Sequence, residues 1–284
     1  MHKVKIIIRI KRLLFIGLSI ILFTSCVSVF KLADLRDESY TYPNDVEKAK
    51  DLIYKMGEAH NIKKWEEIST YSVIFEDEFY GFVGKQAHPF KEDKMKFALS
   101  FIPGTFDGQL EIISGKEKGK KWGMHSWQTY RVDENGSFIE KKNKDMIFWI
   151  PTYQYFIEFP RRIQEATFVD YVGTLVNNGI EAEGVLASWN TDVPQKNLDQ
   201  YLIWMHPETH RIIKIEYTVR DAYGFVSGGA YFNDYKDYNG IILPSVMPVE
   251  SNLVKDKLLH TMRISDFQAD RLEPSKLQPL NLTN

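Results

Sequence analysis

Most of the chain alternates between hydrophobic and polar positions, which is the pattern of half-buried β-strands. Residues 94–102 show it most clearly, because Met95, Phe97, Leu99 and Phe101 fall on one face. Segments of this kind recur at short intervals between Gly and Asn turn signals, a spacing typical of an antiparallel meander. The other predicted strand segments are residues 70–84, 108–116, 121–132, 137–139, 168–189 with a turn at 177–179, 200–205, 211–219, 228–251 and 258–270.

Two segments break this alternation and predict helices. Residues 45–60 repeat apolar side chains at helical spacing, and Asn44 with Glu47 forms a capping-box pattern at the start. Residues 145–163 are mostly apolar or aromatic, and Pro151 and Pro160 are expected to bracket a short helix there. This second segment is too aromatic for an exposed helix, so we expect it to be buried against the sheet as core or as a cavity lining.

The stretch His206-Pro207-Glu208-Thr209-His210 contains two histidines and a glutamate, which raises the question of a metal site. A zinc-protease pattern needs H-E-x-x-H on a helix, so that both imidazoles share one face. Here the second position is proline and the flanking segments are strand-like. The pattern therefore favours the turn of a hairpin, with a metal-dependent activity at His206 and His210 as the alternative.

The first 25 residues have the three-part form of a secretory signal. They combine five basic residues, an apolar run from Leu13 to Phe23 and small residues before Cys26. Because Cys26 is the only cysteine, disulfides within the chain are excluded. Phe23-Thr24-Ser25-Cys26 resembles a bacterial lipobox, which implies cleavage before Cys26 and lipidation there. Val27 is not the aspartate of an inner-membrane retention signal, which favours the outer membrane.

Net charge limits the class of partner, and chain length limits the number of domains. Without residues 1–25, the chain keeps 31 Lys and Arg against 38 Asp and Glu, a net charge of −7. This balance excludes nucleic acid as a partner, since nucleic-acid binding needs a basic footprint. We expect a tether over residues 26–43, a single monomeric domain over 44–272 and a polar tail over 273–284.

The order of these elements resembles the LolA and LolB lipoprotein carriers and the secreted bacterial proteins that share their fold. The resemblance rests on Pro207-Glu208-Thr209, similar to a D-P-x-T turn with His206 in place of the aspartate, and on "YNGIILPSVMPV" at 238–249. It implies an α+β, mainly β fold: a half-open antiparallel β-barrel of about 10–12 strands with helices over its concave face. LolA-type members bind acyl chains in the cavity between them, and no catalytic residues carry over.

The aromatic segment is the candidate binding site, with plain core packing as the alternative. Two arginines follow it and are expected either to meet an anionic headgroup or to form a solvated helix end. The candidate residues are Phe148, Trp149, Tyr153, Tyr155, Phe156, Phe159, Arg161 and Arg162.

The sequence thus predicts a lipid-anchored envelope protein that binds a lipid, an acyl chain or an acylated protein. The prediction includes no cofactor and no enzymatic activity. It also requires a hollow beneath residues 146–159. The alternative is a structural or partner-binding lipoprotein with a filled core.

Overall fold

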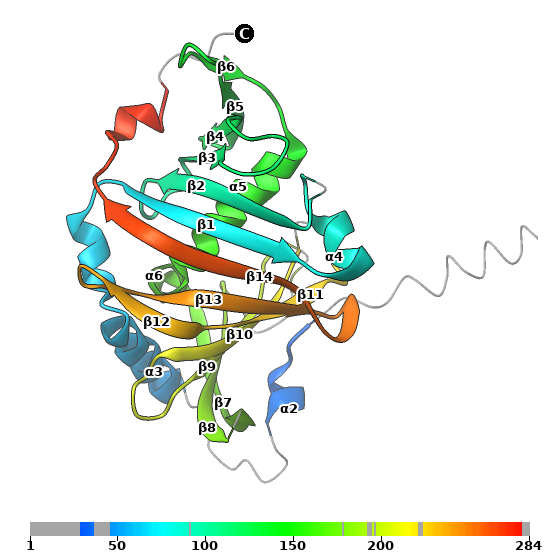
Figure 1. The fold of residues 1–284 in the computed structure, drawn as a ribbon. Coiled ribbons are helices and arrows are strands. Elements are labelled where there is room, and N and C mark those ends of the chain that lie inside the picture. The colour runs from blue at the N-terminus through cyan, green and yellow to red at the C-terminus, as the bar shows by residue number, and fades with distance from the viewer. Residues whose placement is uncertain are drawn as a thin grey trace, which may run out of the picture.

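One strongly curved antiparallel sheet forms the body of the chain in the computed structural model (Figure 1), which describes residues 29–36, 46–90, 92–177, 179–191, 195, 197–220 and 224–279. The sheet has 14 strands in the order β6-β5-β4-β3-β2-β1-β14-β13-β11-β10-β9-β8-β7, with β12 paired to β13. The strands are β1 Tyr71–Phe79, β2 Lys94–Phe101, β3 Gly108–Ile112, β4 Lys121–His125, β5 Gln128–Val132, β6 Phe138–Glu140, β7 Phe168–Asn177, β8 Ile180–Ser188, β9 Tyr201–Met205, β10 Ile212–Thr218, β11 Ser227–Tyr231, β12 Asn233–Tyr238, β13 Ile241–Ser251 and β14 Val254–Ala269.

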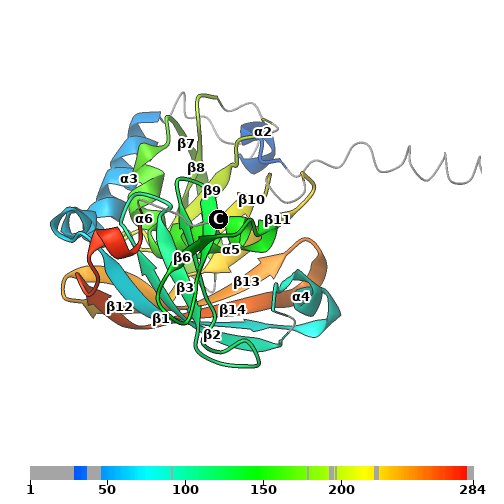
Figure 2. The same ribbon diagram turned by 90° about the horizontal axis from the view of Figure 1, so that it is seen from above.

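The sheet curls around helices but does not close, since β6 and β7 remain at its two ends. Seen from above, it wraps around α5 (Lys144–Ile157) and α6 (Phe159–Arg162), while α3 (Val46–Ala59) lies beside β7 (Figure 2). The remaining helices are α2 Leu32–Leu35, α4 Gly81–Ala87, η1 Ile62–Glu67, η2 Ile163–Glu165 and η3 Pro274–Lys276. The predicted half-open, mainly β architecture with helices over the concave face is confirmed.

Two strand predictions need correction. Residues 121–132 form a hairpin instead of one strand, because Ser126 and Trp127 adopt positive φ angles of 49° and 63° and reverse the chain. Residues 70–84 contain β1 and then the start of α4, where Gly81 has a φ of +63°. Aromatic and apolar residues continue through both turns, as at Trp127 and Phe82, so the strand-like composition hides them. The split of residues 121–132 into β4 and β5 helps to explain why the sheet exceeds the expected 10–12 strands.

The helix predictions are confirmed in position. In α3 the buried side chains are Ala49, Leu52, Ile53 and Met56, at helical spacing. The proposed cap, Asn44, lies outside the described residues. Pro151 lies inside α5, a correction to its expected place at the end of a helix. Its lost N–H would have bonded to the carbonyl of Ile147, a cost that burial of the aromatic residues around it offsets.

The hydrophobic residues form two clusters on opposite faces of the sheet. The larger fills the concave side and includes the inner faces of α3 and α5. The smaller lies on the outer face of β7–β9, where the segment 30–35 packs against it. Its buried members are Val172, Ala182, Leu186, Leu202 and Trp204.

The two ends of the chain also contact the sheet where the structure describes them. Within the expected tether, Arg36 forms an ion pair of 2.7 Å with Asp170. Within the expected polar tail, Leu277 is fully buried, and its carbonyl oxygen accepts a hydrogen bond from the Tyr130 hydroxyl. The signal segment 1–25 and Cys26 lie outside the described residues. Among the helices of the described ranges, none combines the length and apolar character needed to cross a membrane.

Candidate ligand-binding site

Helix α5 begins at a well-formed cap and carries the aromatic segment across the concave face. The side chain of Asn143 accepts hydrogen bonds from the backbone N–H groups of Asp145 (3.0 Å) and Met146 (3.3 Å). This arrangement satisfies two of the amide groups that a helix start leaves unpaired. The helix ends near Glu158, and Pro160 lies in the first turn of α6, a position that tolerates proline.

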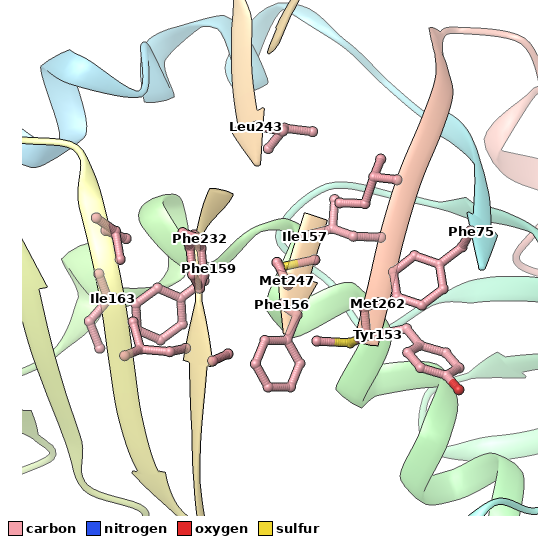
Figure 3. Close-up of a cluster of buried hydrophobic side chains, with 14 of the residues drawn as sticks. Phe75, Tyr153, Phe156, Ile157, Phe159, Ile163, Phe232, Leu243, Met247 and Met262 are labelled. Atoms are coloured by element: carbon pink, nitrogen blue, oxygen red, sulfur yellow. The ribbon is translucent and has the colours of Figure 1, made fainter. Parts of the chain in front are cut away.

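The structure brings the predicted aromatic residues together beneath and beside α5. Tyr153 and Phe159 are fully buried, Trp149 and Phe156 nearly so, and Phe148 and Tyr155 are half-buried. The Tyr153 ring centroid lies 4.7 Å from that of Phe75 on β1. Phe156 lies between the group around Phe159 and the group around Tyr153 and Met262 (Figure 3). The concave side is therefore occupied by the protein's own side chains.

Two surface hollows are present on the described part of the chain. One, of about 190 Å³, is lined by Ser72, Ser100 and other residues on the outer side of β1–β3. The other, of about 260 Å³, lies beside Trp127 and Glu140 at the β5–β6 edge and reaches Ile147 in the first turn of α5. Neither is lined by any of the eight predicted ligand-binding residues. A ligand on the concave face would therefore have to displace side chains that pack there now.

Polar contacts fasten α5 to the β1–β2 side of the sheet. The Tyr153 hydroxyl donates to Asp77 Oδ2 (3.0 Å), and Asp77 Oδ1 lies 2.7 Å from His260 Nδ1. Asp77 is fully buried, so these partners are needed to offset the loss of its hydration. His88 lies near this group, and its own burial lowers the pKa of its imidazole to about 4.

A second buried polar cluster holds the junction of α5 and α6. Glu158 accepts hydrogen bonds from Tyr71 (2.9 Å), Gln154 (2.7 Å) and the N–H of Gly104 (2.9 Å). Burial raises the pKa of the Glu158 carboxyl, and the guanidinium of Arg162, 3.1 Å away, opposes that shift.

The two arginines differ in their surroundings. Arg162 is buried, lies over the ring of Phe106 at 4.1 Å and donates to the carbonyl of Thr105. Arg161 is half-buried and lies 3.8 Å from Glu165. Arg162 thus has an internal role, and of the two only Arg161 keeps appreciable access to solvent. A headgroup contact at these residues stays a prediction.

On its other side, α5 meets β8–β10 through stacked aromatic rings. Tyr155 stacks on Tyr201 at 5.5 Å, Phe156 meets Tyr217 edge-on at 5.4 Å, and Trp189 meets Tyr201 at 5.9 Å. We call these five residues the aromatic seam. Tyr201, Tyr217 and Trp189 were not among the predicted site residues. Tyr201 and Tyr217 share a strand face with buried Ile203 and Ile215, and Trp189 directly follows β8, two positions after buried Ala187, so the alternation could have identified them.

His206 and His210 lie in a hairpin turn between β9 and β10. His206 Nδ1 accepts from the N–H groups of Glu208 (3.2 Å) and Thr209 (3.3 Å), the role of an aspartate oxygen in an Asx turn. The turn interpretation is confirmed, and it explains how His206 replaces the aspartate. Within the described part of the chain, no three His, Cys, Asp or Glu side chains are grouped to hold a metal ion.

Comparisons with known proteins establish the fold. No protein-family model matches the chain, and no curated protein sequence matches it. Solved structures do match. An outer membrane lipoprotein-sorting protein domain from Vibrio parahaemolyticus aligns with a TM-score of 0.50 and 11% identity, covering 81% of this chain and 97% of that one.

Two further structures agree with it. A LolA superfamily protein from Nitrosomonas europaea aligns with a TM-score of 0.51 and 12% identity over 81% of this chain and 97% of the other. A DUF1329 family protein from Desulfovibrio piger aligns with a TM-score of 0.50 and 11% identity over 84% and 98%. The chain therefore has the LolA-like fold that its sequence resembles.

Proposed function

We propose that this chain is a lipid-anchored protein of the bacterial cell envelope that binds a hydrophobic ligand between α5 and the concave face of the sheet. The ligand is a lipid, an acyl chain or an acylated protein. Acylated Cys26 holds the protein to the membrane, and the residue after it, Val27, favours the outer membrane. The proposed activity is ligand binding, which would serve the transport of lipids or lipoproteins.

The observation that carries this proposal is the unequal attachment of α5. Toward β1 the helix is fixed by two buried carboxylates: Asp77 accepts from Tyr153, and Glu158 accepts from Tyr71. Toward β8–β10 it is held through the rings of the aromatic seam. The Phe156 ring carries no donor or acceptor, so an apolar ligand can take its place against Tyr217 without leaving a buried polar group unpaired.

The magnitudes favour this exchange. Displacing the Phe156 ring loses at most about 1.5–3 kcal/mol of burial and about 0.5–1.5 kcal/mol of ring pairing. An acyl chain that buries about ten methylene groups gains on the order of 8 kcal/mol. In this proposal Phe156 moves aside when the ligand binds.

A second function is favoured by a specific observation, the filled concave side. With its own side chains packed there, and with neither hollow lined by a predicted ligand-binding residue, the protein would act as a structural or partner-binding lipoprotein that takes no small ligand. Native mass spectrometry separates the two functions, because only a carrier brings lipid through purification.

Uptake of a fluorescent fatty acid tests the site itself. Phe156→Asp should abolish uptake, because a carboxylate in the seam would lose hydration on ligand binding. Tyr217→Asp, at a half-buried position of the same seam, provides a second variant if the first folds poorly. Tyr54→Asp on the exposed side of α3 is the matched control and should bind like the unaltered protein.

Two results would contradict the proposal. Equal uptake by the unaltered protein and by folded seam variants would reject the seam as the site. Neither bound lipid nor probe uptake in the unaltered protein would favour the filled-core function.

A further inference from the structure

The first described residues of the chain are fastened to one end of the sheet. The N–H of Phe30 donates to Gln200 Oε1 (3.0 Å), and Gln200 Nε2 donates back to the carbonyl of Phe30 (2.9 Å). Arg36 then pairs with Asp170, and the apolar side chains of Leu32 and Leu35 pack on the outer cluster of β7–β9. These contacts fix the position of residues 30–36 on the sheet.

The distance between Cys26 and this attachment is short. Phe30 lies four positions after Cys26, and even a fully extended chain of that length spans only about 14 Å. An acyl anchor at Cys26 therefore lies close to Gln200, at the start of β9. The anchor cannot leave the domain free to turn in all directions above a membrane.

The strand pairing shows what else lies at this end of the sheet. The start of β9 pairs beside the end of β10, and β13 ends beside the start of β11. The end of β1 lies beside the early part of β14, and α4 follows β1 directly. We call this region the anchor end. Figure 1 shows α4, the β13–β14 turn and α2 on this side of the sheet.

Four large apolar side chains are exposed at the anchor end. Phe82 on α4 is 79% exposed, Phe225 in the β10–β11 loop 49%, Leu253 in the β13–β14 turn 42% and Leu258 on β14 38%. The loops that carry them are joined, since Asn252 Nδ2 donates to the carbonyl of Phe225 (2.7 Å). The N–H of Tyr80 likewise donates to the carbonyl of Leu259 (2.9 Å), which joins α4 to β14.

We propose that the anchor end is a membrane-contact surface, with Phe82, Phe225, Leu253 and Leu258 inserted into the headgroup layer of the bilayer. The inference rests on the proposed acylation of Cys26. Exposed apolar groups gain burial at an interface, and one acyl group holds more firmly with a second contact. Exposed Lys255 and Lys257 follow the β13–β14 turn at the start of β14 and suit anionic headgroups.

This orientation turns the aromatic seam toward the membrane. Tyr201 is the first residue of β9 and Tyr217 lies near the end of β10, both at the anchor end. Trp149 in α5 contacts Phe79, the last residue of β1. A lipid leaving the bilayer would therefore meet the seam without crossing water.

Depth measurements on the full, acylated chain test the inference. Acylation leaves Cys26 without a free thiol, so a cysteine introduced elsewhere takes a single fluorescent label. One chain carries Leu253→Cys, and the matched control carries Val176→Cys, at a residue 70% exposed at the opposite end of the sheet. Both are reconstituted on vesicles of phosphatidylethanolamine with some phosphatidylglycerol and a spin-labelled lipid.

We expect the spin-labelled lipid to quench the label at Leu253 several-fold more than the label at Val176. Adding Phe82→Asp and Leu258→Asp should reduce the quenching at Leu253. Equal quenching at both positions overturns the inference. The inference is also overturned if the label at Leu253 is protected from a water-soluble quencher but is not quenched by the spin-labelled lipid. That result would indicate that a protein partner covers this surface. The mass of the N-terminal peptide reports acylation separately, and probe uptake reports ligand binding. Failure of the membrane-contact inference can therefore be distinguished from failure of the proposed function.

Discussion

The stability of the fold should depend on pH through His60, a buried histidine that must stay neutral. His60 follows α3, and its Nε2 accepts from the N–H of Ile212 (3.3 Å). Its Nδ1, which therefore carries the proton, lies 3.3 Å from the carbonyl oxygen of Ile242. Burial lowers the pKa of His60 to about 4, and the charge of Arg211 adds to the shift.

The sign and size of the effect follow from this shift. Below about pH 6.5 the unfolded chain takes up a proton at His60, whereas the folded chain does so only near pH 4. Stability is therefore lost as the pH falls from about 6.5 to about 4. Between about pH 7.5 and about pH 4.5, this residue alone should remove about 2.5 kcal/mol from the free energy of unfolding.

Urea unfolding at these two pH values measures the effect. His60→Gln should lose less stability on acidification than the unaltered protein, by about 2.5 kcal/mol, whatever its stability near neutral pH. Other groups titrate in both proteins, including Glu158, whose raised pKa acts in the opposite direction. The comparison removes their contribution.

Asn61→Ala is the matched control. It deletes the neighbouring hydrogen bond to the carbonyl of Gly240 (2.7 Å) without removing a titrating group. It should lower stability equally at both pH values. If the unaltered protein and His60→Gln lose the same stability between the two pH values, the reasoning from burial is refuted.

Two further predictions concern the polar attachment of α5 and the N-terminal segment. Tyr153→Phe should lower the free energy of unfolding, measured in urea, by about 1–3 kcal/mol, because buried Asp77 loses its hydrogen-bond donor. An effect within experimental error would show that Asp77 does not need that donor. Arg36→Ala removes the ion pair with Asp170. It should increase chymotrypsin cleavage after Phe30 and leave the free energy of global unfolding nearly unchanged. Unaltered cleavage would show that the apolar contacts of Leu32 and Leu35 suffice to hold this segment on the sheet.

Local signals in the sequence were sufficient for much of the architecture. Period-2 alternation identified the strands, because one face of each is buried against α3 or α5 and the other is not. The Asn135-Gly136 and His206–Arg211 turns were also predictable, since their geometry depends on residues a few positions apart. The aromatic character of α5 indicated its burial in the same way.

Only the tertiary structure decided what those elements do together. The reversal at Ser126 and Trp127 has no Gly, Asn or Pro to mark it, and the accommodation of Pro151 depends on packing around the whole helix. The aromatic seam joins residues 155 and 201, and the Asp77–His260 pair joins residues 183 positions apart. Contacts of that kind depend on the curvature of the sheet, which sums small twists over many strands. A sequence specifies which faces are apolar, whereas whether two such faces enclose a hollow or fill it is decided by how their side chains interlock.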